Sequence, residues 1–215
     1  MMQGARQYGN FLTLADARGW LGFPNPQNTS PQDANLQLVL DMACTWVQMF
    51  IGRPASAQEF FERHDGWGGE YIQLHESPVV EVLTCTEYQS TGGSISLSES
   101  TPENPIDGYQ LNYATGRMMR TFAGYSWPRT WFPGSRNIEI TYLAGFNPTP
   151  PDIRLATLEM IAHWWRNTQQ ESANRLGSAG AAAEYDPEED APGLWQGVPF
   201  RIIDLLDSYR LTVIA

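Results

Sequence analysis

The sequence predicts an α+β fold: a helical bundle formed by N- and C-terminal helices, with a mostly antiparallel β insertion. Apolar residues recur at helical spacing near both ends of the 215-residue chain, whereas the middle is rich in β-prone residues and ends in a segment of alternating apolar and polar residues. The length suits one or two domains with a core of their own. We expect N-terminal helices at 1–57, a β-rich insertion at 58–145, C-terminal helices at 146–210 with an acidic linker at 177–197, and a C-terminal arm at 211–215.

The N-terminal part predicts two helices. Thr13 can cap a short first helix, and Asp16, three residues later, can bind the free N–H groups of the first turn. A second helix is expected from Pro31, because Pro suits the first helical position and apolar residues follow at helical spacing. Gly52 and Pro54 are expected to end it.

The middle of the chain predicts strands and turns. Strands are expected at 71–75, 79–88, 94–98 and 138–142, with a loop at 99–108. The Gly-rich segment 65–69 predicts a hairpin turn, since the spacing and the Lys of a phosphate-binding loop are absent.

The C-terminal part predicts a long helix that begins at Pro151 and packs on the helix from Pro31, because single helices of this length need tertiary burial. Met160 and Trp164 are expected on its buried face. A last amphipathic helix is expected from Pro199 to about Tyr209.

The composition excludes several classes of function. The formal net charge is −11, and all 13 basic residues are Arg. An acidic chain is a poor general binder of nucleic acid. No segment has the length of a membrane helix or the apolar core of a signal peptide, so we expect a soluble intracellular protein. Cys44 and Cys85 are expected to be buried free thiols.

The sequence predicts no enzyme, no cofactor and no metal. Catalytic Ser and phosphate-loop motifs are absent, and without Lys there is no Schiff-base chemistry. His64-Asp65 and His75-Glu76 are the only candidates for a metal site or an acid/base pair. They lack the His spacing of common metal motifs, so we expect solvated residues at strand edges. His163 is expected to be a packing residue of a helix.

An Arg-rich block is the strongest binding signal. Residues 59–107 carry ten acids against one Arg, whereas residues 108–138 carry four Arg and no acid, interleaved with aromatic residues. Such a block is typical of a protein interface, of plain packing or of a surface for single-stranded nucleic acid. The negative net charge favours a protein interface, with the acids of 59–107 or 177–190 facing a DNA channel or solvent. The candidate interface residues of the block are Arg117, Arg120, Trp127, Arg129 and Trp131.

The C-terminal end is a second candidate interface. It is β-prone and apolar, so we expect it to pair with a sheet edge of another chain. The alternative is that it folds back on its own β insertion. The candidate residues are Tyr209, Arg210, Leu211, Val213 and Ile214.

Several short motifs resemble a known family when their order along the chain is considered. A strand ends in Thr141-Tyr142-Leu143-Ala144-Gly145-Phe146, a helix starts at Pro151-Asp152, and a last helix led by Pro199 contains Leu205-Leu206 and is followed by Tyr209-Arg210. The segment Leu14 to Leu21, the helix from Pro31 and the strand start Pro78-Val79-Val80-Glu81-Val82 fit the same pattern. The chain thus resembles the head–tail connector (adaptor or head-completion) proteins of tailed bacteriophages.

The resemblance implies a structural protein of the virion neck, made in the host cytoplasm. Family members form an adaptor ring, a dodecamer, that docks on the portal protein and joins the head to the tail. The implied partners are the portal, neighbouring adaptor subunits and a tail-side neck or tail protein, with genomic DNA passing through the channel without specific binding. The alternative is a β-rich carbohydrate- or ligand-binding module that uses Trp67, Trp127 and Trp131 as stacking platforms.

Overall fold

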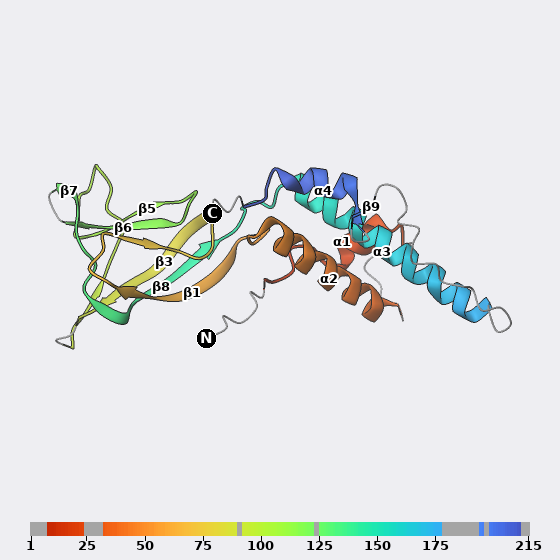
Figure 1. Ribbon diagram of the computed structural model, residues 1–215, viewed down its shortest axis with the longest axis horizontal. Coiled ribbons are helices and arrows are strands. Elements are labelled where there is room, and N and C mark those ends of the chain that lie inside the picture. Colours follow the sequence, from red (N-terminus) through yellow and green to blue (C-terminus); the bar gives the residue numbers. More distant parts are fainter. Residues whose placement is uncertain are drawn as a thin grey trace. The chain divides into compact units, whose positions relative to one another are not determined.

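The computed structural model describes residues 8–23, 32–89, 92–122, 125–177, 194–195 and 198–211. The chain divides into two compact units, coloured by sequence in Figure 1. Residues 1–55 and 149–215 form the helical unit, and residues 56–148 form the β unit. The predicted α+β class is confirmed.

The helical unit contains four helices among its described residues. In chain order they are α1 (Leu14–Trp20), α2 (Asp33–Ile51), α3 (Pro151–Gly177) and α4 (Phe200–Asp207). A short antiparallel pair, β9 (Leu194–Trp195) and β10 (Val198–Pro199), precedes α4.

The helix starts follow from the sequence. Thr13 caps α1 as predicted: its hydroxyl oxygen accepts from the Asp16 N–H at 3.1 Å, and the Asp16 carboxylate accepts from the Thr13 N–H at 2.9 Å. Helix α3 begins at Pro151 as expected. Gly52 ends α2 in the left-handed conformation, with φ of 72°.

The predicted packing of the bundle is confirmed, because α2 packs against α3. Helix α3 also packs against α4, and α1 contacts both α2 and α3. Met160 is completely buried, whereas Trp164 is half-buried. The other apolar residues buried in these helices include Leu36, Leu40, Val47, Ile51, Ile153, Ala156, Ile202 and Leu206.

The β unit consists of two four-stranded antiparallel sheets. The first has the order β1-β8-β3-β4, and the second has the order β2-β6-β5 with β7 paired to β6. The strands are β1 (Gln58–Gly66), β2 (Tyr71–Gln73), β3 (Val79–Tyr88), β4 (Ser94–Ser96), β5 (Gly108–Asn112), β6 (Arg117–Phe122), β7 (Tyr125–Pro128) and β8 (Gly134–Ala144).

The hairpin predicted at 65–69 is wrong. Strand β1 pairs with β8, and β2 pairs with β6, so the Gly-rich segment carries the chain from one sheet to the other. Turn residues identify a change of direction, but the partner of each strand is set by the burial of its apolar face.

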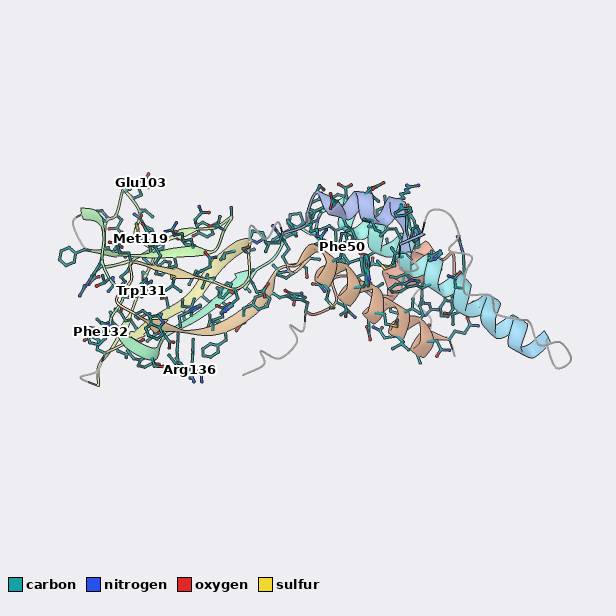
Figure 2. All side chains as sticks on the ribbon, in the orientation of Figure 1. Phe50, Glu103, Met119, Trp131, Phe132 and Arg136 are labelled. Carbon is teal, nitrogen blue, oxygen red and sulfur yellow. The ribbon has the colours of Figure 1, made fainter. Side chains whose placement is uncertain are left out.

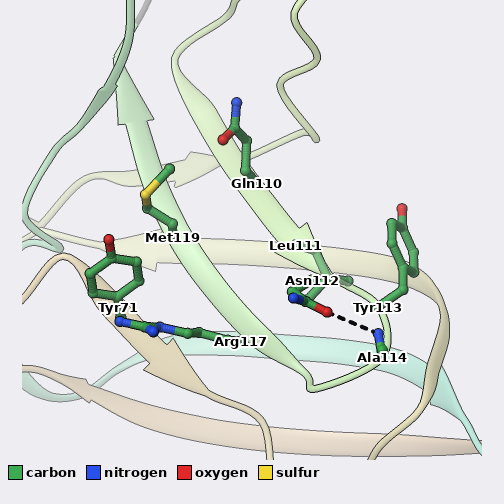
Figure 3. Close-up of a pocket in the computed structure, with 8 residues that line it drawn as sticks. All are labelled: Tyr71, Gln110, Leu111, Asn112, Tyr113, Ala114, Arg117 and Met119. Atoms are coloured by element: carbon green, nitrogen blue, oxygen red, sulfur yellow. Dashed lines mark hydrogen bonds between the residues drawn. The ribbon is translucent and has the colours of Figure 1, made fainter.

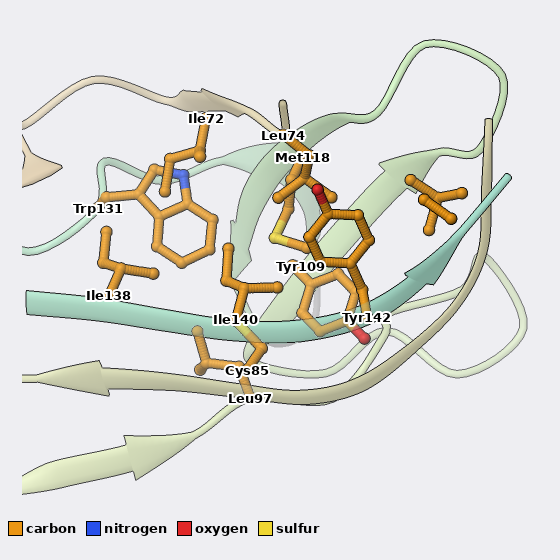
Figure 4. Close-up of a cluster of buried hydrophobic side chains, with 12 residues drawn as sticks. Ile72, Leu74, Cys85, Leu97, Tyr109, Met118, Trp131, Ile138, Ile140 and Tyr142 are labelled. Carbon is orange, nitrogen blue, oxygen red and sulfur yellow. The ribbon is translucent and has the colours of Figure 1, made fainter. Parts of the chain in front are cut away.

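Apolar side chains from both sheets form the core of the β unit (Figure 4). Ile138, Ile140 and Tyr142 alternate along β8 and are completely buried. Met118 of β6 contributes from the second sheet. Cys44 and Cys85 are buried free thiols, as predicted, and burial raises the pKa of Cys85 to about 12.

Gly145, in the motif that ends β8, is required by the backbone. Its φ is 121°, and a Cβ atom there would overlap the carbonyl oxygen of Ser56. Only glycine combines this conformation with so close an approach of two segments. The motif therefore marks the point at which β8 leaves the sheet.

Two predicted segments lie largely or partly beyond the described part of the chain. Of the acidic linker at 177–197, residues 178–193 and 196–197 are outside it, and so are residues 212–215 of the predicted arm. Within the described residues, no helix is both long enough and apolar enough to cross a bilayer.

Candidate functional site

Arg120, a predicted interface residue on β6, lies inside the β unit and is only 1% exposed. Its guanidinium donates to the carbonyl oxygens of Gly108 and Thr121, at 2.9 and 2.8 Å. It also forms ion pairs with Glu87 and Asp107. The expectation for Arg120 is therefore corrected: this side chain links β3, β5 and β6 and is not available to a partner.

Trp131 is also corrected. Its ring is 1% exposed and belongs to the core of the β unit (Figures 2 and 4), so it presents no face to a protein or a sugar. The side chain of Trp127 lies outside the described residues. Trp67, between β1 and β2, is 86% exposed. Of the three proposed stacking platforms, Trp67 is the one whose described ring is open to solvent.

The acidic block and the Arg block partly neutralise each other within the β unit. Arg129 pairs with Asp107 at 3.1 Å, and its side chain stays 44% exposed, so it remains a candidate interface residue. Glu76 and Glu87 are 4% and 3% exposed. These two carboxylates face neither a channel nor solvent, which corrects the expectation for them.

Arg117 lies on an open face of the second sheet (Figure 3). Its guanidinium carbon is 3.8 Å from the centroid of the Tyr71 ring. Both residues line a hollow of about 590 Å³, together with the exposed Tyr113. Arg and Tyr exposed together are typical of the residues that dominate protein interfaces. Arg117 therefore remains a candidate, with Tyr71 as a neighbour that sequence spacing did not indicate.

An exposed apolar stripe runs along α2, and sequence reasoning missed it. We call Leu38, Met42 and Met49 the α2 stripe; they are 60%, 53% and 70% exposed. Their spacing of four and seven residues keeps them on one face of the helix. Met42 and Met49 also line an apolar hollow of about 380 Å³ with Trp46 and Trp164. The signal was present in the sequence, because α2 is apolar on a second face besides its buried one.

Tyr209 connects two motifs of the sequence resemblance. Its hydroxyl donates to the Asp152 carboxylate at 3.0 Å, so the residues after α4 are tied to the first turn of α3. Burial and this hydrogen bond raise the pKa of Tyr209. The Pro-Asp helix start and the Tyr-Arg ending are thus parts of one contact within the helical unit.

The next residues continue this packing. The guanidinium carbon of Arg210 lies 5.4 Å from the centroid of the Phe50 ring. The Leu211 N–H donates to the Ile51 carbonyl at 2.9 Å, while its side chain is 39% exposed. Val213 and Ile214 lie outside the described residues. The beginning of the predicted arm therefore contacts the end of α2.

A cluster of two histidines and one glutamate forms in the β unit, where solvated residues were expected. His64 Nε2 and His75 Nδ1 each lie 2.7 Å from Oε2 of Glu62. The histidines thus meet through Glu62 rather than through Asp65 or Glu76, their sequence neighbours. Glu62 and His64 are two residues apart on β1, which places both side chains on one face of the strand. That spacing was the available signal.

The Glu62 carboxylate accepts hydrogen bonds from several neighbouring side chains. Burial alone would raise its pKa, but hydrogen bonds from His64, Tyr142 and His75 outweigh burial and lower the pKa to about 2. The pKa of Tyr142 changes in the opposite direction: burial and the hydrogen bond to Glu62 raise it. Glu62 is therefore anionic at neutral pH.

Comparison with known proteins finds likeness in structure. No protein-family model matches the chain, and no curated protein matches it. Three solved structures contain similar chains at 19% identity, each covering 100% of this chain. They are the neck of an empty GTA particle computed with C6 symmetry (TM-score 0.58, 98% of that chain), the virion of a native gene transfer agent (GTA) particle (0.60, 98%) and the neck of a native GTA particle computed with C12 symmetry (0.58, 97%).

At this identity the likeness establishes the fold. The chain has the same fold as chains found in GTA particles, over both of its units. The fold implied by the sequence resemblance to phage connectors is thus found in assembled phage-like particles.

Proposed function

We propose that this protein is a structural component of the neck of a phage-like particle, with no catalytic role. Copies of the chain form a ring that docks on the portal and joins the head to the tail, and DNA passes through the central channel. The observation that carries the proposal is the whole-chain likeness to chains of GTA particles, two of them in necks computed with C6 and C12 symmetry.

The α2 stripe is the surface that we assign to the contact between neighbouring copies. Exposed apolar patches mark interaction sites, and Met side chains adapt to an apolar partner surface. A ring repeats one head-to-tail contact, in which the stripe of each copy meets a different surface of the next copy, so one stripe per chain is sufficient when that second surface complements it. The second copy is therefore the occupant that we propose for this face.

The portal and the tail-side protein are assigned to the remaining candidate surfaces. Arg117 with Tyr71, the exposed Arg129, and the segment from Tyr209 to Leu211 offer Arg and aromatic groups to a protein partner. The net charge of −11 supports passage of DNA without adhesion, because phosphates are repelled by an acidic surface.

Mass photometry of the purified chain, alone and mixed with the portal protein of the same genome, tests the proposal. We expect closed oligomers of six or twelve copies, at least in the presence of portal. Particles that remain at 24.1 kDa beside unchanged portal would refute it.

Two variants locate the ring contact. Met42→Asp and Met49→Asp place a carboxylate in the α2 stripe and should abolish the oligomer while the melting temperature stays close to wild type, because both side chains are exposed. Leu83→Asp, at an exposed apolar residue of the β unit, is the matched control. Rings that survive both Met substitutions would remove the stripe from the interface.

A further inference from the structure

The three side chains of the Glu62 cluster bring their ligand atoms to one point. Each of Glu62, His64 and His75 offers one ligand atom, and these three atoms all lie within 4.8 Å of one another. Two of them come from β1 of the first sheet, and the third comes from the connection that follows β2 of the second sheet. Imidazole nitrogen and carboxylate oxygen are the donor set of many zinc sites.

The carboxylate is held in position by groups behind it. The Tyr142 hydroxyl donates to Oε1 of Glu62, and the Glu76 N–H donates to the Tyr142 oxygen at 3.1 Å. The His75 N–H donates to both carboxylate oxygens, at 3.1 Å to Oε1 and 3.3 Å to Oε2. These bonds fix Oε1 and direct Oε2 toward the two imidazole rings, which is the arrangement that supports metal ligands in proteins.

Exposure differs among the three ligands in a way that suits an ion from solution. The side chains of Glu62 and His64 are 11% and 13% exposed, whereas that of His75 is 48% exposed. The inner pair is preorganised, and the outer imidazole is open to solvent. A water molecule can therefore complete the coordination on the side of His75.

We propose that Glu62, His64 and His75 bind one divalent transition-metal ion, with Zn²⁺ as the best match. The ligand atoms are Oε2, Nε2 and Nδ1, and a water takes the fourth position. Ligands about 2.0–2.1 Å from a tetrahedral ion lie roughly 3.3 Å apart, so the present separations of 2.7 Å open by about half an ångström. Rotation of the exposed His75 ring opens its own separation from Glu62, and the separation between His64 and Glu62 opens by a small shift of the His64 ring.

On binding, each ligating nitrogen presents its lone pair to the ion, and a neutral imidazole carries its proton on the other ring nitrogen. The ion replaces the hydrogen bonds that now join the rings to Glu62. Its effect is structural: it cross-links β1 to the segment after β2 and so ties the two sheets of the β unit together. This inference is independent of the proposed neck function.

The test uses the full chain without an affinity tag, stripped with a chelator and dialysed against ZnCl₂. We expect about one bound zinc per chain by elemental analysis, a higher melting temperature with zinc, and the visible spectrum of a tetrahedral site when Co²⁺ replaces it. His75→Ala should weaken zinc binding at least tenfold. His163→Ala, which removes the one histidine outside the cluster, should leave binding unchanged.

Tyr142→Phe separates ligation from positioning. It keeps all three ligands and removes the bond to Oε1, so we expect roughly 10–100-fold weaker zinc binding. The proposal fails if wild-type chain binds no zinc beyond the level of His75→Ala. It also fails if His75→Ala, folded by circular dichroism, binds zinc as tightly as wild type.

Discussion

The helical unit and the β unit differ in how deeply they bury ion pairs. Arg18 and Asp33 of the helical unit keep 7% and 18% side-chain exposure, whereas Arg120 and Glu87 of the β unit keep 1% and 4%. The helices bury a mainly apolar core and leave Leu38, Met42 and Met49 exposed on α2. The β unit buries ionised groups, notably Arg120 with Glu87, in addition to its apolar core. Breaking a buried ion pair by removing one member leaves an uncompensated charge, whereas contiguous exposed apolar residues mark interaction sites. The α2 stripe is therefore our candidate for the contact between copies, and the Arg120–Glu87 pair helps to hold the strands of the β unit together.

The largest effect is expected where the β unit loses its buried charge network. Arg120→Ala leaves Glu87 buried without its cation and should destabilise the β unit by about 3–5 kcal/mol. Arg117→Ala, three residues earlier on the same strand but exposed, is the control and should change stability by less than about 0.5 kcal/mol. Urea denaturation measures both. Equal effects of the two substitutions would contradict the buried role of Arg120.

The next effect belongs to the apolar core of the helical unit. Met160→Ala creates a cavity at a completely buried position and should cost about 2–5 kcal/mol. Met42→Ala, the same substitution in the α2 stripe, should stay within about 0.5 kcal/mol. Thermal melting compares the two. An unchanged melting temperature of Met160→Ala would show that the stability of α3 does not depend on this packing.

A smaller effect is expected at the contact that joins the two sequence motifs. Tyr209→Phe removes the hydroxyl that donates to Asp152 and should destabilise the helical unit by about 1 kcal/mol. Because the bond is specific, Asp152→Ala combined with Tyr209→Phe should lose less stability than the sum of the two single substitutions. Full additivity in this double-mutant cycle would show that the two residues do not interact.

The smallest effect on stability is expected at the C-terminal end. Deleting residues 212–215 retains the Leu211 N–H bond to Ile51, so the melting temperature should change by no more than about 2 °C. Docking on the portal should nevertheless weaken, because we propose that these residues pair with another chain. Pull-down with portal protein measures docking. A truncated chain with a much lower melting temperature and normal docking would show that these residues belong to the fold of their own chain.

Much of the fold could be predicted because its signals are local. The Thr13 cap, the start of α3 at Pro151 and the strand at 79–88 each depend on neighbouring residues alone. The exchange of sheets after Gly66 could not be predicted, since strand pairing depends on residues far apart in the sequence.

The candidate site residues also differ in whether local sequence or only the fold reveals their role. Arg and Trp are residue types typical of protein interfaces. Only the fold reveals that the contacts of Arg120 and Trp131 lie within the β unit. The Glu62 cluster needs β1 and the segment after β2 to meet, so the two-residue spacing of Glu62 and His64 could indicate only two of its three members. The α2 stripe was readable in the sequence, because a second apolar face on a helix that already has a buried face indicates a partner.

The central claim is that this chain forms a closed ring on a portal, and electron microscopy of the two proteins mixed tests it most directly. We predict end-on views in which density for this chain surrounds the portal axis with six- or twelve-fold rotational symmetry and an open centre, lost in Met42→Asp and Met49→Asp. Bare portal rings beside isolated chains, at concentrations where wild-type chain is in excess, would contradict the claim.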